Sequence, residues 1–382
     1  MKKVAFLFLF LLSIPICKAQ VDYQVFESHK LGENREIKIQ LPRGYHDNTS
    51  KSYPLIIVLD GDYMFEIVAG NVDYYSYWED IPESIVVGVN QVDFREADVM
   101  YSEQNSLPME TGAEFFEFLG AELIPHIKNN YRTEKFTVAI GHGETANFIN
   151  YYLLKETPIF QAFITLSPDL AGDMNTYITD RLKAIQTKTF YYLATSTNDV
   201  KSLKKKTEAL NTSISAIDNK SVLYNFNNFE GPTHYALPAH AIPKALESIF
   251  FVFQPISKKE YRETILKLDG SPVDYLLEKY QTISELFGIE KQILVNDFKA
   301  VAAAIKKTEK HGYYQDLGKL ARKQYPDTML GNYYLARFYE ETNEPKRAMK
   351  TYQSAYILDE IGGLTKDLML EKAAEIKADF GY

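Results

Sequence analysis

The sequence predicts an α/β domain with a mostly parallel sheet, followed by a smaller all-α domain. From Val21 to about Gln254, short apolar runs alternate with amphipathic segments. Such alternation is typical of parallel strands with helices on both faces of the sheet. Beyond Pro255 the chain is rich in Lys, Glu and Ala at helical spacing and has no strand signals. We therefore expect an α/β domain over residues 20–254 and a helical domain over 255–382.

The apolar runs identify the expected strands of the α/β domain in chain order. Residues 35–41 alternate, with Ile37, Ile39 and Leu41 on one face, which indicates a half-buried antiparallel strand. Runs typical of buried strands follow at 54–59, 85–89, 136–140, 162–166 and 189–194. Between them, residues 112–127 repeat Phe and Leu at helical spacing, which predicts an amphipathic helix.

The helical domain contains one stretch with the tetratricopeptide (TPR) pattern of small and aromatic residues. Asn332 holds the position at which this repeat usually has Trp. One repeat cannot bury its apolar face alone, so helices between about residues 258 and 325 are expected to cover it. Two interpretations remain open, a helical cap packed on the α/β domain and a groove that binds a protein partner. The residues that carry the pattern are Leu335, Ala336, Tyr339, Ala348, Tyr352 and Ala355.

Residues 1–19 have the form of a signal peptide, with Lys2, Lys3, an apolar stretch at 4–16 and Ala19 before the expected cleavage point. A lipoprotein signal through Cys17 is the weaker alternative, because bulky Ile16 precedes it. We expect an exported protein, periplasmic or secreted, and cleavage would remove the only cysteine.

Charge and composition exclude several function classes. The formal charge is −9; loss of Lys2, Lys3 and Lys18 makes it −12. This argues against a nucleic-acid partner, which requires a basic face. No other stretch is apolar enough to span a membrane. The seven histidines are scattered without metal-ligand spacing, so we expect no metal and no cofactor.

A strand-to-helix corner at residues 139–148, AIGHGETANF, raises the functional question. It has the setting of the G-x-S-x-G nucleophile elbow, in which a serine sits on a sharp turn between strand and helix. Here Gly143 stands where the serine belongs, and Glu144 and Thr145 complete the motif in place of a neutral residue and a glycine.

Three further stretches lie where a hydrolase of this kind needs them. VLDGDYMF, with Asp60 to Asp62, follows a buried strand and can aim a backbone N–H at an oxyanion, although an ordinary turn reads the same way. Asp199 follows another strand, where Asp is also a common helix N-cap. His234 lies in FEGPTHYALP, and the chain order nucleophile, acid, histidine is that of α/β-hydrolases.

Together these stretches resemble the putative-esterase family of α/β-hydrolases, the group of enterochelin esterases and esterase D. The likeness covers residues 21–254 and includes LPRGY before YPLIIVLDGD, and IPESIVVGVN followed by Arg95 and Asp98. The resemblance implies an α/β-hydrolase fold.

The resemblance also implies roles for individual residues. His234 corresponds to the general base, and Asp199 to the acid that orients it, with Glu230 as the alternative acid. The backbone N–H groups of Asp62 and Glu144 correspond to the oxyanion hole. Gly143 occupies the nucleophile position.

Glycine at position 143 removes the atom that starts acyl transfer, since the mechanism needs an oxygen nucleophile beside the histidine. Glycine adopts the strained elbow conformation without steric cost, so the fold should be intact. We expect Thr145 to point away from the elbow tip, Ser167 to cap a loop, and His142 to pack behind the nucleophile. Glu144 with His234 could still position a water for direct attack.

Three hypotheses follow. The first is an exported pseudo-hydrolase that binds a small ester-like ligand, or a protein through its C-terminal helices. The second is a hydrolase of carboxylic esters, of the siderophore or acylated-sugar class by resemblance. The third is a structural protein of the cell envelope.

Overall fold

The computed structural model describes residues 21–381, which form two compact units. The first contains residues 21–76 and Glu83–Ile249, and the second contains Tyr77–Pro82 and residues 250–381. The expected signal peptide, with Cys17, lies outside the described residues. No helix among those described is long and apolar enough to cross a membrane.

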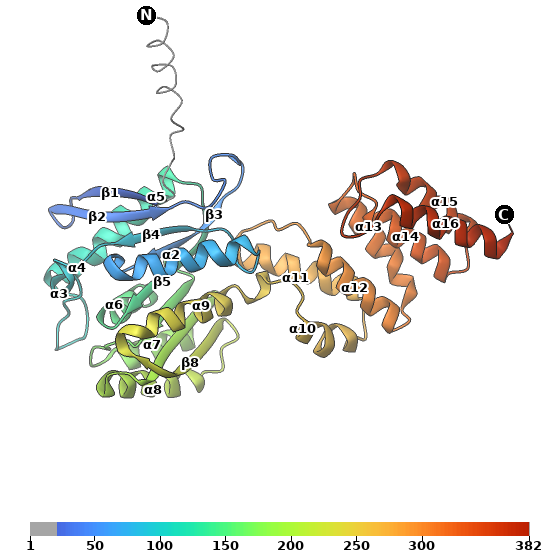
Figure 1. Ribbon diagram of the computed structural model, residues 1–382. Coiled ribbons are helices and arrows are strands. Elements are labelled where there is room, and N and C mark those ends of the chain that lie inside the picture. Colours follow the sequence, from blue (N-terminus) through green and yellow to red (C-terminus); the bar gives the residue numbers. More distant parts are fainter. Residues whose placement is uncertain (1–20, 382) are drawn as a thin grey trace, which may run out of the picture. The chain divides into compact units, whose positions relative to one another are not determined.

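The first unit is built on one eight-stranded sheet in the order β1-β2-β4-β3-β5-β6-β7-β8 (Figure 1). The β1–β2 and β2–β4 pairs are antiparallel, and every later pair is parallel. The mostly parallel sheet predicted from the sequence is confirmed. The strands are β1 (Val21–Ser28), β2 (Glu33–Gln40), β3 (Tyr53–Val58), β4 (Ile85–Val89), β5 (Thr133–His142), β6 (Ala162–Leu166), β7 (Thr189–Asn198) and β8 (Val222–Thr233).

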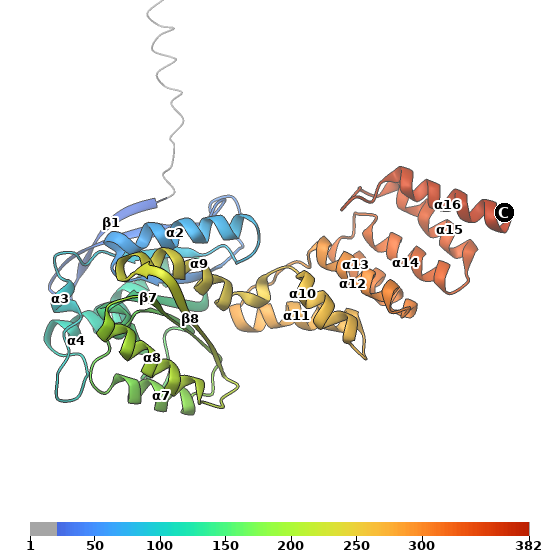
Figure 2. The same ribbon diagram turned by 60° about the horizontal axis from the view of Figure 1, so that its bottom comes forward.

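Helices cover both faces of this sheet (Figures 1 and 2). Leu55 and Ile57 of β3 pack in one core cluster with the helices from α4 to α8. Strand side chains alternate between faces, so Ile56 and Val58 point to the opposite side, where α2 and α9 lie. These two helices are joined by the hydrogen bond from Tyr75 Oη to Glu247 Oε1, 2.8 Å. The helices are α2 (Gly61–Tyr77), α3 (Arg95–Asp98), α4 (Glu110–Glu117), α5 (Ile124–Asn130), α6 (Glu144–Leu153), α7 (Met174–Ala184), α8 (Lys201–Ser215) and α9 (Leu237–Ile249).

The segment predicted as one helix over 112–127 is helical but not uniform. A π-helical turn, Phe118–Leu123, separates α4 from α5. Pro125, in the first turn of α5, has no N–H to donate to the helical ladder. The local change in hydrogen bonding is of the kind found in π-bulges.

The second unit is all-α, as the sequence predicts. Consecutive helices α13, α14, α15 and α16 pack against one another in turn. Tyr352 and Ala348 of α15 belong to a buried cluster with Ala336 of α14 and Met369 of α16. Asn332, at the usual Trp position, accepts two hydrogen bonds from Arg322 of α13, at 2.9 and 2.6 Å. The helices are α10 (Lys258–Glu263), α11 (Pro272–Phe287), α12 (Val295–Lys307), α13 (Tyr314–Gln324), α14 (Leu330–Glu341), α15 (Pro345–Ser354) and α16 (Lys366–Phe380).

Candidate functional site

The corner between β5 and α6 has the backbone geometry of a nucleophile elbow. Gly143 is the N-cap of α6, with φ 62° and ψ −118°, a conformation that strains any residue with a β-carbon. Its N–H donates to the carbonyl of Leu166, and its carbonyl accepts from the N–H of Asp169, both at 2.9 Å. Both bonds hold Gly143 at the carboxyl ends of the strands. The turn therefore keeps the shape of the elbow although it carries no nucleophile.

Gly141 explains why the first glycine of the motif is still present. A β-carbon there would lie 2.5 Å from the carbonyl carbon of Thr145, well inside any allowed contact. The glycine lets the strand and the start of α6 approach closely. The corner thus requires Gly141 for packing, whereas a β-carbon at Gly143 would make contacts of ordinary length only.

His234 and Asp199 meet beside Gly143. Asp199 follows β7, and His234 begins a short 3₁₀ turn after β8, so parallel pairing of these strands brings their ends together. His234 Nδ1 lies 2.8 Å from Asp199 Oδ1, and the Asp199 side chain is fully buried. The carboxylate that contacts the histidine is therefore that of Asp199, while Glu230 lies on the exposed part of β8.

The pKa of Asp199 is lowered to about 2. Burial alone would raise it, but hydrogen bonds from His234, Thr195 and the N–H of Val200 stabilise the ionised form more strongly. An ionised carboxylate is only an acceptor, so Nδ1 of His234 must donate to it. The Nε2 atom of a neutral His234 then carries a lone pair.

Nε2 of His234 faces the missing side chain. A β-carbon on Gly143 would lie 3.7 Å from His234 Nε2 and 3.7 Å from Arg95 Nη2, at ordinary contact distance. A serine hydroxyl would fit between the turn and the imidazole. The structure thus brings Gly143, His234 and Asp199 together in the arrangement of a catalytic triad. The nucleophile position, residue 143, carries no side chain.

His142 supports this arrangement from behind. Its ring stacks on His234, with centroids 4.2 Å apart, and its Nδ1 lies 3.3 Å from the hydroxyl of Tyr63. Burial, with smaller contributions from nearby positive charge, lowers the pKa of His142 to about 3. His142 is therefore neutral at physiological pH and acts as packing for His234.

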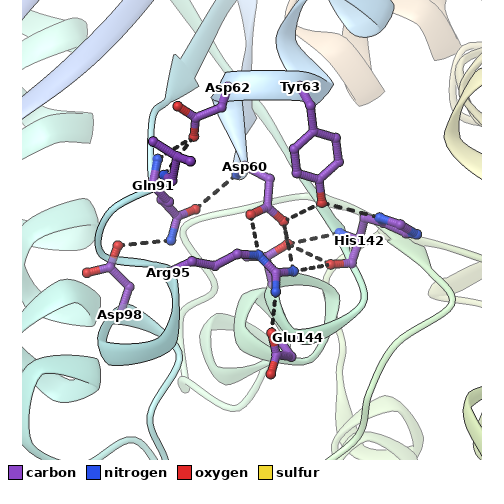
Figure 3. A network of polar contacts seen from close by, with 10 residues as sticks. Asp60, Asp62, Tyr63, Gln91, Arg95, Asp98, His142 and Glu144 are labelled. Carbon is purple, nitrogen blue, oxygen red and sulfur yellow. Dashed lines mark hydrogen bonds and ion pairs between the residues drawn. The ribbon is translucent and has the colours of Figure 1, made fainter. Parts of the chain in front are cut away.

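A polar hub around Asp60 joins three elements next to the elbow (Figure 3). Asp60 is buried at the end of β3 and accepts from Nε of Arg95, 2.6 Å. It also accepts from the hydroxyls of Tyr63, 3.0 Å, and Thr145, 2.7 Å. Arg95 in turn contacts the carboxylate of Glu144 and donates to the carbonyl of His142, 3.2 Å. The hub fixes the β3–α2 loop, α3 and the elbow relative to one another.

Sequence reasoning did not identify this hub. The sequence indicates Arg95 only through the family resemblance, and it gives no role to Tyr63. A usable signal was present, because Asp60 and Arg95 both follow strands that pair in parallel, β3 and β4, whose carboxyl ends meet at one edge. Thr145, which replaces the last glycine of the motif, points into the hub and away from the elbow tip, as expected.

An open pocket of about 490 Å³ lies over Gly143. Glu144 lines it, and its N–H, at the start of α6, has no earlier helical carbonyl to bond. On the α2 side the wall is Tyr63. The carboxylate of Asp62 turns away to accept from the N–H groups of Gln91, 2.6 Å, and Val92, 3.0 Å. The oxyanion role of the Asp62 and Glu144 N–H groups stays a prediction.

The described residues contain no group of three or more His, Cys, Asp or Glu side chains arranged to hold a metal ion.

A parallel sheet with an elbow after β5, a His–Asp pair after β8 and β7, and a pocket above them defines an α/β-hydrolase. Residues 28–185 match the model of the family named Putative esterase, and the chain belongs to this family. The matched range contains Gly143, whereas Asp199 and His234 lie beyond it. A search of curated proteins found no match to the chain.

Solved structures with the same architecture extend the comparison. An uncharacterised protein from Capnocytophaga ochracea is 32% identical, with 94% of this chain and 100% of that chain covered and a TM-score of 0.83. An IroE-like serine hydrolase from Shewanella oneidensis is 19% identical, with 79% and 99% covered and a TM-score of 0.60. The siderophore hydrolase EstA from Aspergillus nidulans is 12% identical, with 63% and 97% covered and a TM-score of 0.54. The last two likenesses concern the fold alone.

Proposed function

We propose that this protein is an exported pseudo-hydrolase, which binds a small ligand over Gly143 but forms no acyl-enzyme. The observation that carries the proposal is the elbow itself. Its backbone has the nucleophile conformation, φ 62° and ψ −118°, and the residue there has no side chain. The acyl transfer of α/β-hydrolases starts from a side-chain nucleophile at this point, which the histidine only activates.

Neighbouring hydroxyl groups are poor substitutes for the serine. Thr145 Oγ1 is buried, donates to Asp60 and accepts from the N–H of His142, 2.9 Å. Ser167 is also buried, directly after β6, and its hydroxyl has no hydrogen-bond partner among the described residues, so the expectation that it caps a loop is wrong. Burial and the nearby Asp60 carboxylate raise the pKa of Tyr63, so its phenol stays protonated and weakly nucleophilic. The hydroxyls of Thr145 and Tyr63 are therefore engaged by Asp60, and Ser167 does not line the pocket over Gly143.

The retained parts of the site support a binding role. The pocket is open, its walls combine aromatic and charged side chains, and the His234–Asp199 pair offers a fixed acceptor at its base. Pockets of this kind, mostly preformed with few placed polar groups, are typical ligand sites.

One observation favours a second candidate function, hydrolysis by water. Gly143 and His234 both line the open pocket, so a water in that pocket can approach Nε2 of His234. His234 would take the proton of that water as it attacks an ester carbonyl, and later return a proton to the leaving alcohol. The name of the fold relative EstA, a siderophore hydrolase, suggests siderophore esters as substrates, and acylated-sugar esters are the alternative that the family resemblance suggests.

Two measurements on the purified protein test these alternatives. The pseudo-hydrolase proposal expects no turnover of p-nitrophenyl acyl esters above background and no labelling by a fluorophosphonate. Hydrolysis that is abolished by His234→Ala, without any fluorophosphonate adduct, would establish the water mechanism in its place. A stable acyl or phosphonyl adduct on any side chain would refute the absence of a nucleophile.

Export and a protein partner belong to the same proposal. The signal-like residues 1–19 support export to the periplasm or beyond, which fractionation of cells that express the full chain would test. The TPR-like helices α14 and α15 support a partner of protein nature. Capture of one stoichiometric partner by the wild-type chain, lost when exposed residues of α14 are changed, would be the positive result.

A further inference from the structure

The region above Gly143 that a serine side chain would face, here called the vacated space, is bounded by His234 and Arg95. These two side chains determine which chemical groups of a ligand can enter it. A β-carbon there would be at 3.7 Å from both His234 Nε2 and Arg95 Nη2. A ligand oxygen must keep van der Waals distance from the Gly143 backbone, so it would lie farther out, in the pocket that Gly143, Arg95 and His234 all line. The Asp199 carboxylate fixes Nδ1 of His234 as a donor, which leaves Nε2 as an acceptor directed at the space. The ligand must therefore place a hydrogen-bond donor here.

Arg95 excludes a cationic donor. Its guanidinium is held in place by Asp60, through Nε at 2.6 Å and Nη2 at 3.2 Å, and cannot move aside without leaving that buried carboxylate unpaired. An ammonium group in the vacated space would lie beside this fixed positive charge, and the carboxylates of Asp60 and Glu144 offer it little compensation because they already bond to the guanidinium.

The lone pair of His234 excludes a carboxylate. A carboxylate is an acceptor only, so it would face the lone pair of a neutral His234 acceptor to acceptor, and it would lie close to Glu144 and Asp199 as well. The guanidinium offers little compensation, because its N–H groups already bond to Asp60, Glu144 and the carbonyl of His142. Among common ligand groups, a neutral hydroxyl meets these conditions.

We propose that the pocket binds a neutral, hydroxyl-bearing ligand, with one alcohol oxygen in the space left by the missing serine side chain and its proton donated to His234 Nε2. This inference rests on the proposed binding function and names the ligand class, alcohols and polyols. The rest of the pocket suits such ligands. The carboxylates of Glu144 and Asp169 are acceptors for further hydroxyls, and the exposed ring of Tyr235 offers an apolar wall beside His234.

Three ligands that share one ring and differ in a single group test the chemistry directly. Benzyl alcohol, benzoate and benzylammonium are titrated at neutral pH against the full wild-type chain, and ring NMR signals of the histidines report on the site. We expect benzyl alcohol to bind at least about tenfold tighter than either ion and to shift the His234 signals. Tighter binding of benzoate or benzylammonium, equal binding of all three, or no binding of the alcohol would overturn the proposal.

Gly143→Ala tests the location, because its methyl group fills the vacated space. We expect it to weaken benzyl alcohol binding by about tenfold or more. The matched control is Gly32→Ala. Gly32 also has a positive φ, 66° against 62°, but nothing lies within 4 Å of its added methyl. Unchanged binding by Gly143→Ala would place the alcohol elsewhere.

The comparison on the wild-type chain does not depend on the folding of any variant. Failure of this inference is also distinct from failure of the proposed function. The first appears as the wrong ligand preference in a protein that turns over no ester, and the second appears as ester turnover.

Discussion

At the scale of single residues, position 143 separates two properties that are usually coupled in hydrolases. These properties are the elbow conformation and its backbone strain. The elbow conformation persists at Gly143, but the strain that a serine would experience there is absent, because glycine tolerates φ 62°. The His234–Asp199 pair is held by contacts that do not involve residue 143, so its geometry survives the absence of the nucleophile.

Gly143→Ser should therefore restore a reactive hydroxyl. The new Oγ would lie within hydrogen-bond reach of His234 Nε2, because the β-carbon that carries it lies 3.7 Å away. We expect covalent labelling by a fluorophosphonate, and in the double variant with His234→Ala a fall in the labelling rate by about 100-fold or more. Labelling is measured by intact-protein mass spectrometry over time. An inert Gly143→Ser variant that is fully folded would show that the pair is not poised for catalysis.

Asp199 should stabilise the fold in a pH-dependent way. Its pKa is lowered from 3.8 to about 2 in the folded protein, so its contribution is fully present above pH 4 and is lost as the pH falls through 2. The depression corresponds to about 2 kcal/mol. Urea unfolding of the wild type and of Asp199→Asn between pH 5 and pH 2 should show the wild-type advantage shrinking by roughly this amount. A constant difference across this range would contradict the assignment.

At the scale of elements, the site is assembled from the carboxyl ends of β3, β4, β5 and β7 and the end of β8. The hub at Asp60 is the joint between them, and Thr145 is its link to α6. The motif usually has glycine at position 145, and glycine has no hydroxyl that could bond to Asp60. The departure at position 145 thus has a structural role, because it ties the elbow helix to the β3–α2 loop.

Thr145→Val should destabilise the protein without changing the shape of the helix. Valine keeps the volume but leaves the N–H of His142 without its partner and Asp60 with one donor fewer, both in buried surroundings. The expected loss is about 1–3 kcal/mol in the free energy of unfolding. Thr145→Ser, which keeps the hydroxyl, is the control. Equal losses in both variants, measured by urea denaturation, would assign the effect to packing of the methyl group.

The element scale also shows what the sequence allowed and what it concealed. Strands β4 and β6 were predicted with their observed bounds, since continuous apolar runs mark buried parallel strands. Strands β1 and β8 were missed because both lie at the edges of the sheet. Tyr23 and Val25 of β1 are largely exposed, and β8 includes several Asn residues, so neither has the apolar period of a covered strand.

The site was predictable only in part, for a related reason. Motif order indicated Gly143, Asp199 and His234, since each follows a strand and parallel strands end at a common edge. The choice of Asp199 over Glu230 as the contacting acid needed the register of β7 and β8, which places Asn198 opposite Thr233. Periodicity cannot supply a register between strands that are joined by a helix of 15 residues.

At the scale of the whole molecule, each of the two units contains a hydrophobic cluster of its own. One core packs the sheet of the first unit against its helices, and the other lies among α14, α15 and α16. A unit that buries its own apolar cluster can unfold locally, because local unfolding is cooperative within such a unit and does not have to involve the rest of the chain. The pocket over Gly143 is built entirely from residues of the first unit.

Tyr352→Ala should therefore loosen the helical unit and leave the site unchanged. Tyr352 is fully buried, and its hydroxyl donates to Glu340 at 2.8 Å. Truncation of a buried aromatic side chain costs about 3–5 kcal/mol. Hydrogen exchange should accelerate for amides of α14, α15 and α16, while amides of β5, β6 and β7 keep wild-type protection. Tyr356→Ala, at a position that is 49% exposed, is the matched control and should exchange like the wild type. Faster exchange in the strands that carry the site would show that the two cores are energetically coupled.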